Sequence, residues 1–166
     1  MGNKITVLDH ESVKRKLERI AHQLHEENFE EKGIVLIGVA DRGSILVKRL
    51  AKRLKEISEL EITIAEIKLD KDKPLENPVE LSVDAKELKG KVVVLVDDVL
   101  MSGRTLMYAA SFLIRSALKK LVTVVLVDRM HRTFPIRADI VGLTLSTTLR
   151  EHISVELGKQ DAVYLA

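Results

Sequence analysis

The stretch VVVLVDDVLMSGRT, residues 92–105, determines both the fold class and the candidate site. Its first five residues, 92–96, are only valine and leucine, which is typical of a parallel strand covered on both faces. Two adjacent aspartates follow this run, and a turn of small residues then precedes a predicted helix over about residues 105–118. The stretch therefore combines a buried strand, two carboxylates and a turn that opens a helix.

Strand and helix patterns alternate along the chain on both sides of this stretch. Further strands are predicted at residues 34–39, 62–67, 79–83 and 121–127. Amphipathic helices are predicted after Asp9, which is a suitable N-cap, and after a loop at residues 41–44. Such alternation is typical of an open, mostly parallel α/β sheet flanked by helices, with ligands at the carboxyl ends of its strands.

The tail of the chain differs from this regular part. It begins with a polar, irregular segment and has strand-like patterns only at residues 140–145 and 153–157. We expect one domain over residues 1–166, with a core at about residues 30–128. Residues 129–166 and the N-terminal segment would form a small hood over the carboxyl edge of the sheet.

Composition excludes several classes of function. The net charge of +2 does not favour a strongly basic nucleic-acid binder, and an aromatic content of 3% leaves few platforms for stacked bases. Cysteine is absent, so disulfides and thiolate metal sites are excluded, and a cytoplasmic protein is expected. Residues 1–12 lack the apolar run of a signal peptide, and no run approaches the ~20 residues that span a bilayer, so no membrane association is expected.

The turn before the predicted helix has the composition of a phosphate-binding loop. A helix start presents unpaired N–H groups and the positive end of a dipole, Gly103 permits close approach, and Ser102 and Thr105 add hydroxyl groups. Ionised Asp97 and Asp98 are acceptors suited to two vicinal hydroxyls, such as those of a ribose. The segment therefore predicts a sugar-phosphate site, while the plain alternative is a helix N-cap beside solvated acids.

This segment resembles the signature of type I phosphoribosyltransferases, in which a hydrophobic strand, two acids and a Thr/Ser-Gly-x-Thr loop recur. The resemblance implies that Asp97 and Asp98 hold the ribose hydroxyls of phosphoribosyl diphosphate. It also implies which residues wrap the 5-phosphate: Met101, Ser102, Gly103, Arg104 and Thr105.

The family has a diphosphate-binding loop after its first core strand, and the corresponding loop here consists of Ala40, Asp41, Arg42 and Gly43. By this resemblance Arg42 would pair with the departing diphosphate. The alternative is an ordinary turn from strand to helix.

Within this superfamily, residues 126–139 resemble the pyrimidine-operon attenuation regulators that also act as uracil phosphoribosyltransferases. In such proteins this segment covers the nucleobase, so Ile136 and Arg137 are expected to contact the base; the alternative is a solvated loop. Purine-specific relatives have an acid at the position of Met101, where an apolar side chain cannot exchange a proton with a purine. This position therefore favours a pyrimidine.

Two segments depart from the regulators. Their mobile lid carries a Leu-Tyr-Arg-Asp-like stretch, whereas this chain has Asp70 for the tyrosine and Lys71 for the arginine. The excursion over residues 73–91 is also about ten residues shorter, and a lysine lacks the bidentate fork of arginine. Residues 147–151 differ from the basic stretch of the relatives as well.

The resemblance implies a uracil phosphoribosyltransferase of pyrimidine salvage, with Asp97, Asp98, Arg42 and Lys71 as catalytic residues. Mg²⁺ would be carried by phosphoribosyl diphosphate, without dedicated protein ligands. A homodimer is expected. The alternatives are an RNA-binding attenuation regulator, suggested by four basic residues on the helix after residue 44, and a purine enzyme of the same superfamily.

Overall fold

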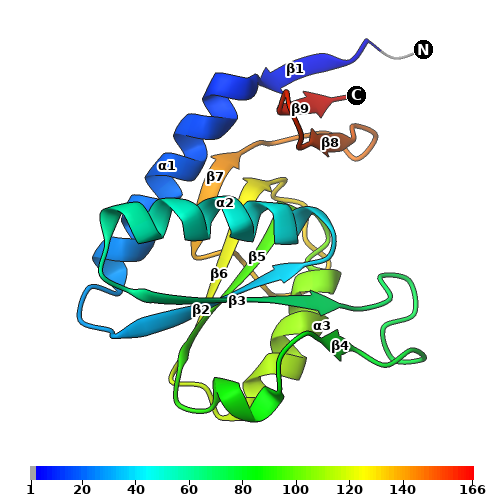
Figure 1. Ribbon diagram of the computed structural model, residues 1–166. Helices are drawn as coiled ribbons and strands as arrows, with labels where there is room; N and C mark the ends of the chain where they lie inside the picture. Colours follow the sequence, from blue (N-terminus) through cyan, green and yellow to red (C-terminus); the bar gives the residue numbers. More distant parts are fainter. Residues whose placement is uncertain (1–2) are drawn as a thin grey trace.

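The computed structural model describes residues 3–166, and its centre is a six-stranded sheet in the order β4-β3-β2-β5-β6-β7 (Figure 1). All neighbouring strands are parallel except β3 and β4, which are antiparallel. The predicted open, mostly parallel α/β sheet is therefore confirmed. The strands are β2 (Gly33–Val39), β3 (Glu61–Lys68), β4 (Glu80–Leu81), β5 (Val92–Leu100), β6 (Lys120–Asp128) and β7 (Ile140–Thr144).

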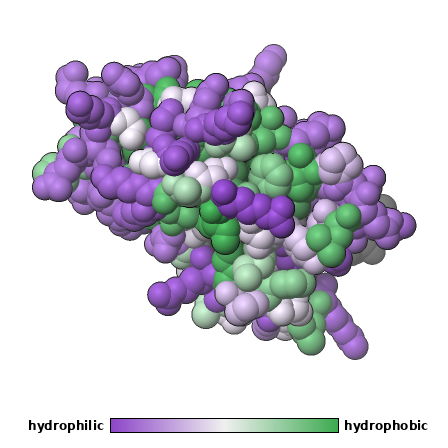
Figure 2. All heavy atoms as spheres, turned by 90° about the horizontal axis from the view of Figure 1, so that it is seen from below, coloured by the Kyte–Doolittle hydropathy of each residue, from purple (hydrophilic) through white to green (hydrophobic). Residues whose placement is uncertain are grey.

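Helices cover both faces of this sheet. Two of them, α1 (His10–Glu27) and α2 (Arg42–Ile57), lie on one face, and α3 (Arg104–Leu113) lies on the other (Figure 1). Short 3₁₀ turns, η1 (Ala85–Leu88) and η2 (Ile114–Ser116), accompany α3. Figure 2 shows the molecule from the side of α3, where apolar and hydrophilic side chains are interspersed.

The side chains of β5 alternate between the two layers. Val92, Val94 and Val96 pack with α1 and α2, whereas Val93 and Leu95 pack with α3. This period of two explains why the run contains no polar residue, since both faces of a central strand are covered.

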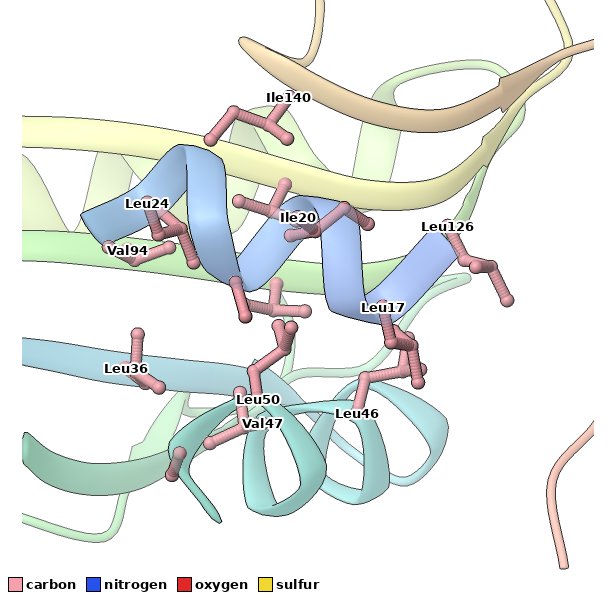
Figure 3. Packing of buried hydrophobic residues seen from close by; sticks show 14 of the residues in the cluster. Leu17, Ile20, Leu24, Leu36, Leu46, Val47, Leu50, Val94, Leu126 and Ile140 are labelled. Atoms are coloured by element: carbon pink, nitrogen blue, oxygen red, sulfur yellow. The ribbon is translucent and has the colours of Figure 1, made fainter. Parts of the chain in front are cut away.

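The larger core cluster lies between α1, α2 and the sheet. Figure 3 shows Leu17 and Ile20 of α1 on the side that faces Leu46 and Leu50 of α2. Each of these side chains is at most 9% exposed. Fully burying one such side chain contributes about 1.5–3 kcal/mol, so this layer holds α2, and the turn before it, firmly against the sheet.

A second, antiparallel sheet joins both ends of the chain. It consists of β1 (Ile5–Leu8), β9 (Ala162–Leu165) and β8 (Ile153–Glu156), in that order. Ile5 pairs with Leu165, and Figure 1 shows the two termini side by side at this sheet. The sequence patterns indicated β8 but neither β1 nor β9.

Several expected boundaries need correction. The core sheet extends beyond residue 128, because β7 pairs with β6. Helix α3 ends at Leu113 rather than near residue 118, since Ala117 has a positive φ of 52°. Helix α2 already begins at Arg42, which shortens the loop expected at residues 41–44. No helix within residues 3–166 has the length and apolar character needed to cross a lipid bilayer.

Candidate functional site

One pocket of about 210 Å³ lies around the carboxyl-terminal end of β5 and the start of α3. Nine of the residues expected in the site line it: Arg42, Lys71, Asp97, Asp98, Met101, Ser102, Gly103, Arg104 and Thr105. Five apolar residues complete the lining: Val99, Leu100, Leu106, Val125 and Ile153. The chain thus brings five separate segments to one cavity: the start of α2, the loop after β3, the stretch from the end of β5 into α3, β6 and β8.

The two acids lie inside β5 rather than after it, and both are buried. Asp97 Oδ1 accepts a hydrogen bond from the Asp98 amide (2.9 Å), and Asp98 Oδ1 accepts one from the Val99 amide (2.8 Å). The second oxygen of Asp98 forms an ion pair with Nε of Arg42 at 2.5 Å. Arg42 uses only Nε in this pair, and its side chain lines the pocket's edge toward solvent, being 54% exposed.

Asp97 titrates far from its usual range. Its burial raises the pKa to about 8, the neighbouring Asp98 adds to the increase, and the positive charge of Lys71 acts in the opposite direction. Asp97 is therefore largely protonated at neutral pH in the free protein. A ligand that needs both carboxylates ionised must displace this proton.

This raised pKa makes fold stability depend on pH. The native state holds the Asp97 proton between about pH 4 and about pH 8 whereas the unfolded chain does not, so the free energy of unfolding falls as pH rises through this window. Asp97→Asn removes the titration but keeps an acceptor oxygen. We expect the variant to gain at least about 1 kcal/mol relative to the unmodified protein between about pH 5 and about pH 8.5, measured by urea denaturation.

The stability difference between the two proteins is the quantity that tests this expectation. A difference that is equal at both ends of the pH window contradicts a raised Asp97 pKa. Asp84→Asn is a suitable control because Asp84 is exposed and caps the short turn η1 outside the pocket.

The turn before α3 has a left-handed residue, Gly103, and is supported by the segment after β6. Gly103 has a φ of 84°, and a Cβ atom at this position would lie 2.8 Å from Cγ2 of Ile136. The carbonyl of Ser102 accepts hydrogen bonds from the amides of Thr133 (2.9 Å) and Phe134 (3.0 Å). Residues 102–105 of this turn line the pocket, and the Arg104 amide donates a hydrogen bond to Ser102 Oγ at 3.2 Å. The start of α3 thus borders the pocket on a turn that the following segment supports.

The first turn of α2 approaches β5 unusually closely. A Cβ atom on Gly43 would lie 2.5 Å from the carbonyl oxygen of Val96, so only glycine fits. Of the four residues expected to bind diphosphate, Arg42 lines the pocket, whereas Ala40, Asp41 and Gly43 shape the turn that presents it. The Ala40–Asp41 peptide bond is cis.

The residues expected to contact the base do not line this pocket. Ile136 and Arg137 border a separate, open depression of about 570 Å³ formed by residues 132–137. The side chain of Ile136 packs in the core cluster beside α3, and the Arg137 carbonyl accepts a hydrogen bond from Thr123 Oγ1 at 3.0 Å. Their contact with a base therefore remains a prediction.

Sequence reasoning overlooked Asp128, which is buried at the carboxyl end of β6. It forms an ion pair with Arg132 and accepts a hydrogen bond from the Met130 amide at 2.9 Å. This pairing gives the segment after β6 a fixed turn. Its position at the end of a buried strand, like that of the acids in β5, is the signal by which the sequence could have identified it.

The basic face of α2 is partly neutralised by ion pairs within the chain. Arg49 forms an ion pair with Asp161 at 2.6 Å, and Arg53 forms ion pairs with Glu18 (2.6 Å) and Glu56 (2.8 Å). Half of the four basic residues that suggested an RNA-binding face are therefore engaged in ion pairs within the chain.

Comparisons with known proteins agree with this geometry. The sequence model of the family described as "Phosphoribosyl transferase domain" matches residues 5–159. The chain is 40% identical to "Bifunctional protein PyrR" of Alkaliphilus metalliredigens, covering 99% of this chain and 96% of that protein. It is 36% identical to the Bacillus subtilis protein of the same name, covering 97% and 94%.

Solved structures share the fold. A hypoxanthine-guanine phosphoribosyltransferase from Bacillus anthracis has a TM-score of 0.70 at 26% identity, covering 88% of this chain and 85% of that one. A hypoxanthine phosphoribosyltransferase from Trypanosoma cruzi has a TM-score of 0.75 at 19% identity, covering 84% and 81%, and this likeness concerns the fold alone.

Proposed function

This chain belongs to the phosphoribosyl transferase domain family, among the proteins named bifunctional PyrR, and from that premise we propose that it transfers the phosphoribosyl group of phosphoribosyl diphosphate to uracil. The observation that carries the proposal is the pocket in which paired acids, a helix start and three cationic residues, Arg42, Lys71 and Arg104, meet. Each of these features suits one part of the substrate.

The ground-state contacts follow from the chemistry of the pocket. The amides around Gly103 and the hydroxyls of Ser102 and Thr105 are donors for the 5-phosphate. The carboxylates of Asp97 and Asp98 are acceptors for the two ribose hydroxyls. These contacts would fix the ribose with its anomeric carbon toward the open part of the pocket.

The reaction exchanges two bonds at that carbon. The bond to the diphosphate oxygen breaks and its electron pair leaves with the diphosphate, while a bond to N1 of uracil forms and the N1 proton passes to the departing diphosphate or to water. In the transition state positive charge develops on the ribose and negative charge on the diphosphate. The aspartates stabilise the first charge, and Arg42 and Lys71 stabilise the second. Mg²⁺ bound to the diphosphate would offset part of its charge, and the carboxylates are hard oxygen donors compatible with this ion.

Support for a pyrimidine comes from Met101, which lines the pocket and cannot act as an acid or base. The test is a panel of uracil, hypoxanthine, guanine and xanthine, each incubated with phosphoribosyl diphosphate and Mg²⁺. We expect uridine monophosphate as the main product. Formation of purine nucleotides alone would overturn the choice of uracil, and no product from any base would overturn transfer itself.

A second candidate function is attenuation of a pyrimidine operon through RNA binding, with the pocket acting as a nucleotide sensor. It is favoured by the shortened lid and by the similarity to proteins whose name states that they are bifunctional. RNA binding through several phosphates weakens steeply as salt rises, whereas turnover of a small substrate does not. Absence of salt-sensitive binding to a transcript leader would eliminate this function.

A further inference from the structure

The loop between β3 and β4 is organised around a single carboxylate, that of Asp70. Its Oδ1 accepts hydrogen bonds from the amides of Asp72 and Lys73, both at 2.9 Å. Its Oδ2 accepts a hydrogen bond from Nδ2 of Asn77 at 2.7 Å. One side chain thus joins both ends of the turn over residues 70–77.

The rest of the loop adds two kinds of anchor. Leu69 and Pro74 are buried, so the loop is attached to the protein before and within the turn. Arg104 of α3 donates a hydrogen bond through Nη2 to the carbonyl of Asp72 at 3.2 Å. The turn is therefore tied to the same helix start that forms the candidate phosphate site.

Lys71 lies between these fixed points, next to Asp70 in the chain. It lines the pocket, and its positive charge acts to lower the pKa of Asp97 there. A long lysine side chain on a free loop loses much conformational entropy when it is held at one site. Fixing its backbone in advance lowers this cost. The structure thus shows Lys71 presented to the pocket by a turn that is already formed.

We propose that Asp70 is a positioning residue, which holds the loop over residues 70–77 in the conformation that directs Lys71 into the pocket. The importance of this positioning for catalysis rests on the proposed phosphoribosyl transfer. It assigns a role to the aspartate that stands where the resembling regulators have a tyrosine. A short, fixed turn carrying a lysine would then replace a longer lid carrying an arginine.

The charge state of Asp70 supports this role. The amides of Lys73 and Asp72, followed by Asn77, hold the pKa of the Asp70 carboxyl below its usual value, so the group is ionised at neutral pH. An ionised carboxylate accepts hydrogen bonds more strongly than a neutral group. Asparagine at this position would keep one acceptor oxygen for the two amides, and alanine would keep none.

The test compares Asp70→Ala, Asp70→Asn and Lys71→Ala, with affinity for phosphoribosyl diphosphate measured by calorimetry in the presence of Mg²⁺. We expect Asp70→Ala and Lys71→Ala each to weaken binding about tenfold, the scale of one lost charge-assisted contact. Asp70→Asn should restore most of the affinity. Asp84→Ala is the matched control, because Asp84 caps η1 through the Lys86 amide at 2.9 Å but lies outside the pocket.

The double variant separates positioning from general stability. If Asp70 acts through Lys71, the combination of Asp70→Ala with Lys71→Ala should bind no more weakly than Lys71→Ala alone. Fully additive losses would overturn the proposal. Asn77→Ala, which removes only one of the contacts of Asp70, should weaken binding by less than Asp70→Ala and provides a milder variant if Asp70→Ala does not fold.

A ligand-free measurement distinguishes this inference from the proposed function. Carboxyl NMR titration should show the Asp97 pKa rising equally in Asp70→Ala and Lys71→Ala, because the Lys71 charge lowers it in the native pocket. An unchanged Asp97 pKa in Asp70→Ala would overturn the positioning role even if the substrate binds. If phosphoribosyl diphosphate does not bind the unmodified protein but the Asp97 pKa still rises in both variants, the proposed phosphoribosyl transfer is overturned and the positioning role of Asp70 stands.

Discussion

Asp98→Asn should lower kcat/KM for nucleotide formation by about a hundredfold to a thousandfold while the protein stays folded. The Asp98 carboxylate accepts from the Val99 amide and forms the 2.5 Å ion pair with Arg42. An asparagine keeps the acceptor for the amide but loses the charge that offsets positive charge on the ribose. Its NH₂ group would also face the Arg42 guanidinium, so Arg42 would leave its place beside the acid.

Asp161→Asn is the matched control for this variant. Asp161 is also buried and also forms an ion pair with an arginine of α2, Arg49 at 2.6 Å, but it lies outside the pocket. Both variants should lose stability from a broken buried pair, and only Asp98→Asn should lose turnover. Steady-state kinetics with uracil measures the difference; turnover in Asp98→Asn equal to that of the control would remove the acid from the mechanism.

The sheet was predictable because its signals are local. The strands β2, β5 and β6 are built on apolar runs, and α1 begins where Asp9 caps it, with Oδ1 accepting from the Ser12 amide at 2.8 Å. The strands β1 and β9 have four residues each and pair the two ends of the chain. No local pattern reports such a distant pairing, so the second sheet was overlooked.

The candidate site shows the same division between features with a local sequence signal and features that depend on distant residues. Residues 97–105 are contiguous, and the order of strand, turn and helix that the sequence predicts for them is enough to place them at one pocket. The ion pair between Arg42 and Asp98 joins residues 56 positions apart, and the turn around Asp70 depends on side-chain geometry. Ile136 and Arg137 border another depression, and Ile136 packs close to Gly103, so their expected contact with a base stays a prediction.

Gly103→Ala should weaken binding of phosphoribosyl diphosphate about a hundredfold or more. Alanine at a φ of 84° costs about 1–2 kcal/mol of backbone strain. The new methyl group would also lie 2.8 Å from Ile136 Cγ2 and 3.3 Å from the carbonyl oxygen of Phe134, which adds about 1–3 kcal/mol of overpacking. The turn must move to relieve the contact, and the amides at the start of α3 move with it.

Gly90→Ala isolates the backbone part of this effect. Gly90 has a similar φ of 71°, but a Cβ atom at this position would have no neighbouring atom within 4 Å, and the residue is outside the pocket. The variant should lose only about 1–2 kcal/mol of stability and keep full affinity. Calorimetry with phosphoribosyl diphosphate and thermal unfolding of both variants separate the two contributions. If Gly103→Ala bound the substrate as tightly as Gly90→Ala, the amides of this turn would not be the phosphate site, and the sugar-phosphate assignment of the pocket would lose its main support.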